Sequence, residues 1–204
     1  MLHITGKTII TAALFLAASC SHKNEWTPEE NTIINAGIPL RVLTIFDRED
    51  NLQLRTPSKE LSDAEIASDL FRVLSEKLLG TVTDPSQDGV GIAAPQVGLL
   101  RRVVAVQRFD KEGEPFEVYP NIRITGMRGE TLPGPEGCLS VPGWRGDVER
   151  YRDIDIKYTS PKSLKDTSER VQGFSAVIFQ HECDHLDGIL YIDKAVPGSL
   201  KISD

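Results

Sequence analysis

The sequence predicts a single α+β domain, in which mostly antiparallel strands pack around a C-terminal helix. Three observations carry this prediction. One helical segment is followed by several short strands and then by a late helix, without the strand–helix alternation that a parallel sheet requires. The late helix carries the motif HExxH at 181–185. The chain has 204 residues, which is enough for one hydrophobic core and not for two.

The first helix is predicted to run over residues 62–79. Ser62 and Glu65 form a capping box, in which each side chain bonds to the backbone of the other residue. Apolar residues then recur at helical spacing, at Ile66, Leu70, Val73, Leu74 and Leu78. Gly80 is expected to end the helix.

Short strands are predicted at 103–106, 116–124 and 148–158, where apolar and β-branched residues dominate. The segment 126–137 contains several glycines and two prolines. We therefore expect a long loop there, which carries residues toward a functional site.

A helix over HExxH places two histidines on one face. His181 and His185 are four residues apart, so their Cβ atoms lie about 6 Å apart and both rings can reach one metal ion. Glu182 suits the role of general base for a water molecule on that ion. Two surface histidines on an ordinary helix are the alternative, but four histidines in the whole chain make a chance HExxH a poor explanation.

The residues around the motif support a helix. Phe174, Val177 and Ile178 precede it at helical spacing. Cys183 points away from the metal face and is interpreted as a small core residue. Asp184 lies nearer that face, where it is expected either to orient a ligand or to be solvated.

A catalytic HExxH site needs a third protein ligand. Few residues follow the motif, so the stronger candidate lies upstream, at Cys138 in the segment Glu136–Ser140 (EGCLS). A nucleophilic cysteine paired with histidine is the competing role for Cys138. That role leaves Glu182 and the second histidine unexplained.

The segment Gly89–Gln96 (GVGIAAPQ) resembles a dinucleotide-binding fingerprint. Its context rejects this reading, because a polar loop precedes it and Pro95 falls where the helix should continue. We interpret the glycines as allowing a ligand to approach the backbone closely. Gln96 then offers an amide donor, with a surface glutamine as the alternative.

The N-terminus resembles a bacterial lipoprotein signal. Residues 9–18 form a short apolar run, followed by Ser19 and Cys20. We predict a signal peptide at 1–19, a lipidated Cys20, a polar tether or arm at 20–39 and one catalytic domain at 40–204. The protein would then be exported and membrane-anchored through Cys20. A cytoplasmic protein with a misassigned start is the alternative.

The charge of the chain bears on its partners. The formal net charge is −7, and no stretch rich in lysine or arginine compensates for it. Such a chain is a poor match for phosphate backbones, so no nucleic-acid partner is expected. Three cysteines, two of them assigned other roles, do not indicate a disulfide framework.

Together, the segments 89–96, 136–140 and 180–188 resemble the three signature segments of the peptide deformylase family, and the likeness extends over about residues 40 to 195. The resemblance implies an enzyme that removes the formyl group from N-formylmethionyl peptides and releases formate. It implies that Cys138, His181 and His185 bind one divalent metal ion. The expected ion is Fe²⁺, and Zn²⁺, Ni²⁺ or Co²⁺ could replace it. Glu182 would be the general base.

The resemblance also implies the surroundings of the substrate. The Gln96 amide and the backbone N–H of Leu139 would stabilise the negative charge on the carbonyl oxygen. Gly89 and Gly91 would pair with the extended peptide. A methionine pocket would be lined by Val90, Phe174, Val177 and Ile178, and the bulk of Phe174 would make it shallower. Arg145 and Arg150 would contact substrate or Glu136, or else lie in solvent.

Three other functions compete with deformylation. A zinc endopeptidase would keep HExxH but does not explain Gly89–Gln96 or the upstream Cys138. An exported amidohydrolase would act on other small N-acyl peptides. A lipid-anchored binding protein would capture formyl peptides without turning them over.

Overall fold

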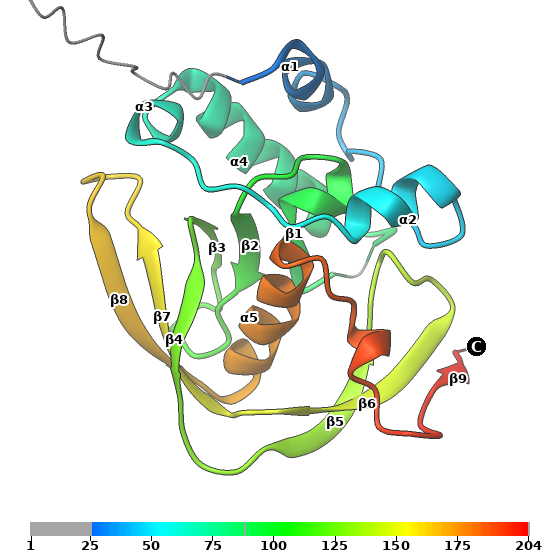
Figure 1. The fold of residues 1–204 in the computed structure, drawn as a ribbon. Coiled ribbons are helices and arrows are strands. Elements are labelled where there is room, and N and C mark those ends of the chain that lie inside the picture. The colour runs from blue at the N-terminus through cyan, green and yellow to red at the C-terminus, as the bar shows by residue number, and fades with distance from the viewer. Residues whose placement is uncertain (1–25, 88, 204) are drawn as a thin grey trace, which may run out of the picture.

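Helix α5 (Gly173–Leu186) lies at the centre of the fold, with strands around it and the other helices at one end (Figure 1). The computed structural model describes residues 26–87 and 89–203. The other helices are α1 (Pro28–Ile34), α2 (Arg48–Leu54), α3 (Asp63–Ile66) and α4 (Asp69–Val82). The strands are β1 (Gly91–Ala93), β2 (Val103–Gln107), β3 (Phe116–Pro120), β4 (Arg123–Met127), β5 (Leu132–Gly137), β6 (Trp144–Arg150), β7 (Asp153–Thr159), β8 (Asp166–Gln172) and β9 (Lys201–Ile202). The predicted α+β class and the late helix are confirmed.

The strands form three antiparallel sheets, in the orders β1-β2-β3, β4-β7-β8 and β5-β6-β9. Strand β1 pairs with β2 so that Gly91 lies opposite Val106. Two short 3₁₀ helices, Ala94–Val97 and Tyr191–Asp193, follow β1 and α5. Because β1 packs directly on α5, the glycine-rich segment lies against the helix that carries HExxH.

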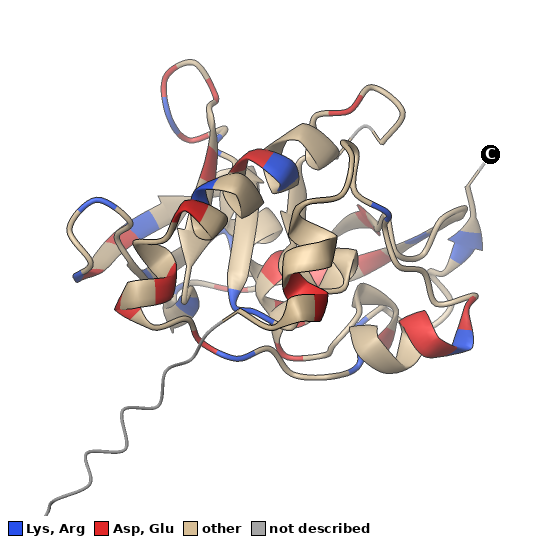
Figure 2. Cartoon of the chain, turned by 90° about the horizontal axis from the view of Figure 1, so that it is seen from above, with Lys and Arg blue, Asp and Glu red and all other residues tan. Residues whose placement is uncertain are grey.

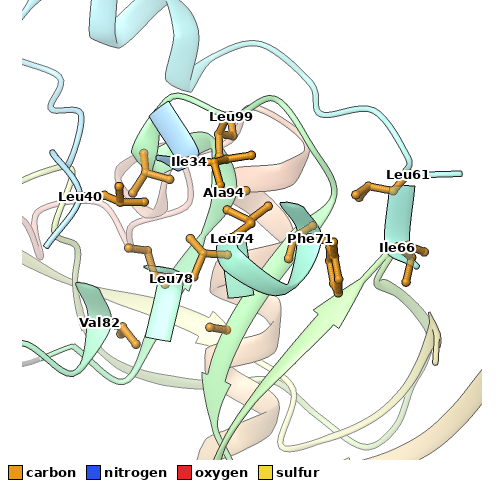
Figure 3. Close-up of a cluster of buried hydrophobic side chains, with 14 residues drawn as sticks. Ile34, Leu40, Leu61, Ile66, Phe71, Leu74, Leu78, Val82, Ala94 and Leu99 are labelled. Carbon is orange, nitrogen blue, oxygen red and sulfur yellow. The ribbon is translucent and has the colours of Figure 1, made fainter. Parts of the chain in front are cut away.

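One part of the core lies under α4 (Figure 3). Phe71, Leu74 and Leu78 of this helix are buried together with Ile34 of α1 and Leu99. Burying one such side chain stabilises the fold by about 1.5–3 kcal/mol relative to leaving it exposed. The second part of the core lies between α5 and the first two sheets and includes Cys183, at 6% exposure, as predicted.

The prediction of one continuous helix over 62–79 was wrong, although its capping box is present. Helix α3 ends at Ile66, and Ser68 begins a new helix because its hydroxyl accepts a hydrogen bond from the backbone N–H of Phe71 at 3.2 Å. Gly80 does not end α4. A Cβ at position 80 would lie 2.9 Å from Ile38 Cγ2, so the absence of a side chain at Gly80 leaves room for Ile38.

Two predicted strands are each divided in the structure. The segment 116–124 turns at Asn121, which has a φ of 56°. The side-chain amide of Asn121 stabilises this turn, since it accepts a hydrogen bond from Leu61 N (2.7 Å) and donates one to Leu61 O (2.9 Å). The segment 148–158 is divided between β6 and β7.

The predicted loop over 126–137 was also wrong in part. Its last six residues form β5, with Pro133 and Pro135 inside the strand. Proline is tolerated there because β5 is at the edge of its sheet, where one side of the backbone needs no ladder partner.

The segment 20–39, predicted as a polar tether or arm, contains helix α1. Thr27 and Glu30 form a capping box, and Pro28 occupies the first turn. Glu30 also pairs with the buried Arg101 at 2.6 Å, which fixes α1 to the domain. The predicted signal 1–19 and Cys20 lie outside the described residues. Within the described part, none of the helices combines the length and apolarity that crossing a membrane would need.

Acidic and basic residues are dispersed over the helices, strands and loops, as Figure 2 shows. Many of them form ion pairs with each other. Helix α5 carries few basic residues, so its charged groups are mainly those of the HExxH segment.

Candidate active site

Helix α5 and the turn after β5 bring together three side chains that could hold a metal ion. Ligand atoms of Cys138, His181 and His185 all lie within 4.8 Å of one another. Cys138 Sγ is 3.2 Å from His185 Nε2, and the two imidazole rings are 5.0 Å apart at their centroids. A thiolate and two imidazoles at this spacing fit the ligand set of a divalent metal such as zinc or iron.

A buried carboxylate orients one of these histidines. His181 Nδ1 donates to Glu136 Oε2 at 2.8 Å, which leaves Nε2 free to face the cluster. Burial alone would raise the pKa of Glu136, but the hydrogen bonds from His181 and Arg150 outweigh it and lower this pKa to about 2. Such a partner fixes the tautomer of a ligating histidine and makes it a stronger ligand.

The carboxylate of Glu136 is in turn fixed by Arg150. Arg150 Nε lies 2.7 Å from Glu136 Oε1, and Arg150 Nη1 lies 2.6 Å from Asp184 Oδ2. Arg150 is only 3% exposed, which excludes the solvated alternative for this residue. Asp184 contacts Arg150 and Lys194, not the ligands, so its influence on the cluster passes through Arg150 and Glu136.

Glu182 is buried beside the cluster of Cys138, His181 and His185. Burial raises the pKa of its carboxyl group to about 7. Its Oε2 is buried without a hydrogen-bond partner among the described residues. The backbone of Gly91 packs on it so closely that a Cβ at Gly91 would lie 2.5 Å from Glu182 Oε1. This carboxylate is therefore held in place while one oxygen remains free for a proton.

The side chain of Gln96 is buried and oriented, which excludes the surface alternative. Its Oε1 accepts a hydrogen bond from Ala93 N at 2.8 Å, so the amide nitrogen must point the other way. That nitrogen lies 3.6 Å from Cys138 Sγ and 3.3 Å from Ser140 Oγ. A preoriented N–H donor thus adjoins the ligand cluster.

These side chains open into a cavity of about 510 Å³. Among the residues predicted for the substrate site, its wall includes Gly89, Val90, Gly91, Gln96, Leu139, Phe174, Val177 and Ile178. Phe174 is 47% exposed and packs on Phe109 with ring centroids 5.3 Å apart. Its ring therefore stands at the mouth of the cavity.

Some contributors to the site were not found by sequence reasoning. Ser140 is buried beside Gln96, and Trp144 and Ser203 line the cavity. The role of Glu136 as partner of a histidine was also missed, although its place two residues before Cys138 in the EGCLS segment was a usable signal. Ser203 lies far from every motif and gave no signal.

Three comparisons place this arrangement among known proteins. The family model described as polypeptide deformylase matches residues 41–200. A peptide deformylase of Leptospira biflexa is 40% identical over 148 residues, which are 69% of this chain and 81% of the relative. One of Fusobacterium nucleatum is 40% identical over 144 residues, which are 71% of this chain and 79% of the relative.

Solved structures show the same similarity. The Met-Ala-Ser-bound class I type b peptide deformylase of Acinetobacter baumannii is 34% identical, with a TM-score of 0.68 over 78% of this chain and 99% of that chain. The actinonin complex of a peptide deformylase from Synechococcus elongatus is 32% identical, with a TM-score of 0.68 over 80% of this chain and 84% of that chain.

Proposed function

The chain belongs to the polypeptide deformylase family, and we infer that it hydrolyses the formyl group from N-formylmethionyl peptides and releases formate. The observation that carries this function is the grouping of Cys138, His181 and His185 with Glu182 and Gln96 around one cavity. The protein is a metal-dependent hydrolase.

Fe²⁺ is the metal that we propose for the site, with Zn²⁺, Ni²⁺ or Co²⁺ able to take its place. The support is the ligand set, because a thiolate with two imidazoles suits borderline divalent ions better than Mg²⁺ or Ca²⁺. Cys138 and the two histidines would hold the ion. When bound, it acts as a Lewis acid and makes hydroxide available from water near neutral pH.

The chain's own residues then handle the proton and the developing charge. Glu182 accepts the proton of the attacking water and passes it to the departing amine, for which a pKa near neutrality is suited. The Gln96 amide and the backbone N–H of Leu139 donate to the carbonyl oxygen of the formyl group as it becomes negative. The loss of one such donor raises a barrier by about 3 kcal/mol.

The cavity wall provides the substrate contacts of this proposal. The backbone of Gly89 and Gly91 would pair with the extended peptide, as an added strand does. Val90, Val177 and Ile178 would surround the methionine side chain, and Phe174 would close the mouth of that pocket.

Formate release from formyl-Met-Ala, measured with metal content on the same Fe²⁺- or Ni²⁺-loaded sample, tests the function. Glu182→Ala should retain the metal and lose turnover, whereas Cys138→Ala should lose the metal. Cys183→Ala is the matched control, because burial raises the pKa of the Cys183 thiol to about 12 and keeps it protonated in the core. A wild-type protein that binds metal but releases no formate would refute the proposal.

We also propose that the protein is exported and anchored to a membrane through a lipid on Cys20. The support is the apolar run at 9–18 and the small residues before Cys20. Labelling with palmitate in cells should depend on Cys20. Unchanged labelling and fractionation of Cys20→Ala would show that the signal interpretation is wrong.

A further inference from the structure

One residue of the cavity wall, Ser203, lies beyond the family match. That match ends at residue 200, whereas β9 covers Lys201–Ile202 and Ser203 lines the cavity. Strand β9 pairs with β6 in a register that sets Lys201 opposite Arg145. The end of the described chain therefore adds a third strand to the sheet of β5 and β6, and Cys138 directly follows β5.

Several contacts hold this strand in place. Ser203 N donates to Gly143 O at 2.9 Å, and Asp147 N donates to Ser199 Oγ at 3.0 Å. Gly146 leaves room for Leu200, since a Cβ at Gly146 would lie 2.8 Å from Leu200 Cδ2. The strand is therefore a fixed part of the wall.

Strand β9 and the residue after it position Arg145, which has no carboxylate partner within residues 26–87 and 89–203. Its Nε donates to Ser203 Oγ at 3.3 Å. Its guanidinium carbon lies 3.8 Å from where a Cβ of Gly137 would be, so the charged group sits beside the residue that precedes Cys138. Other arginines, such as Arg150, pair with carboxylates, but Arg145 has no ion-pair partner among the described residues.

A second cation lies next to Arg145. Lys201 is its cross-strand partner, so both side chains project from the same face of the sheet, and Lys201 also lacks an ion pair in the described part of the chain. Two like charges opposite each other are destabilising on their own. Arg145 lines the cavity and Lys201 lies beside it, so in a chain of net charge −7 this pair of positive charges fits an anionic ligand.

We propose that Arg145, positioned by Ser203 and supported by Lys201, binds a carboxylate of the peptide downstream of the formylmethionine. The proposal rests on the deformylase function. The carboxylate is either the C-terminus of a short formyl peptide or an acidic side chain at the second or third residue. An extended peptide advances about 3.3 Å per residue, so these positions lie just beyond the residue at the metal cluster.

The test compares kcat/KM for formyl-Met-Ala-Ser with that for its C-terminal amide, using the full metal-loaded chain. Formyl-Met-Ala-Asp amide and formyl-Met-Asp-Ala amide distinguish a side-chain carboxylate from a terminal one. We expect the preferred acid to exceed the neutral amide by roughly 5- to 10-fold at low salt, as for a charge-assisted contact near solvent. The preference should shrink as the ionic strength rises.

In Arg145→Gln the acid-to-amide ratio should fall to about one. Ser203→Ala should lower the ratio part of the way, and Ser203→Thr should restore it, because the hydroxyl is kept. Arg48→Gln is the matched control: Arg48 is exposed on α2, outside the cavity, and its loss changes the net charge equally.

The outcomes separate this inference from the proposed function. Equal turnover of every acid and amide by the wild type, or an unchanged ratio in Arg145→Gln, would overturn the carboxylate site and leave deformylation intact. An absence of formate from all four peptides would refute the function itself.

Discussion

Replacing Gly91 with alanine tests whether the β1 backbone sets the position of Glu182, the proposed general base. The added Cβ would lie 2.5 Å from Glu182 Oε1 and 2.7 Å from Ile178 Cγ2, whereas ordinary contact begins at 3.4 Å. The Glu182 carboxylate must therefore move by about 0.9 Å. A displacement of about 1 Å at a reacting group costs on the order of 100-fold in rate.

The fold should survive this change. Overpacking of this kind costs about 1–3 kcal/mol in the free energy of unfolding, and the end of a glutamate side chain gives way more easily than backbone. We expect Gly91→Ala to bind metal at wild-type stoichiometry, to melt at a somewhat lower temperature and to lose about 100-fold in kcat. Formate release, metal analysis and thermal denaturation measure the three quantities.

The matched control is Gly37→Ala. A Cβ at Gly37 meets no atom within 4 Å, and its backbone is not left-handed. This variant should keep both stability and activity. Wild-type kcat in Gly91→Ala would refute the reasoning, because Glu182 would then tolerate displacement or not act as the base.

Three further predictions concern the pair Glu136–His181, the protonation of Glu182 and the end of α5. Glu136→Gln should weaken metal binding by about 10- to 100-fold in a competition titration, because His181 loses its charged partner; unchanged affinity would argue against this orienting role. Since a base acts deprotonated and a bound cation lowers the pKa of a nearby carboxyl group, kcat/KM should rise with pH to a plateau whose limb lies at or below about pH 7. A kcat/KM that falls as the pH is raised from 5 to 7 would contradict the role of Glu182 as a base. Gly188→Ala should lower the free energy of unfolding by about 1–3 kcal/mol in urea denaturation, because φ at Gly188 is 74° and the added Cβ would lie 2.5 Å from Arg55 O. A smaller loss would mean that the backbone relaxes there.

The chemical centre was the part most open to prediction from sequence. The two histidines of HExxH are four residues apart on a helix, so the proximity of His181 and His185 follows from the pattern alone. Cys138 followed from the need for a third ligand. Gln96 was harder, because only the hydrogen bond from Ala93 N shows which way its amide points.

The errors in the fold have a common cause: tertiary contacts override local patterns. Asn121 divides a strand by bonding to Leu61, which is sixty residues away. The prolines of β5 signal a loop, and only the edge position of the strand makes them acceptable. Ser203 enters the cavity through pairing between β6 and β9, and no sequence periodicity marks such a short strand.

The attachment of α1 gives the molecule a defined orientation. Trp26 donates through Nε1 to Ser68 Oγ at 3.3 Å, and the guanidinium of Arg101 lies 5.0 Å from the centroid of the Trp26 ring. Figure 1 shows α1 and α3 at one end of the molecule and β5 and β6, which line the cavity, at the other. A protein coupled to a solid support at the N-terminal side of Trp26 would thus be held at the end that carries α1 and α3, away from β5 and β6, and bead-bound enzyme should turn over peptides as readily as free enzyme.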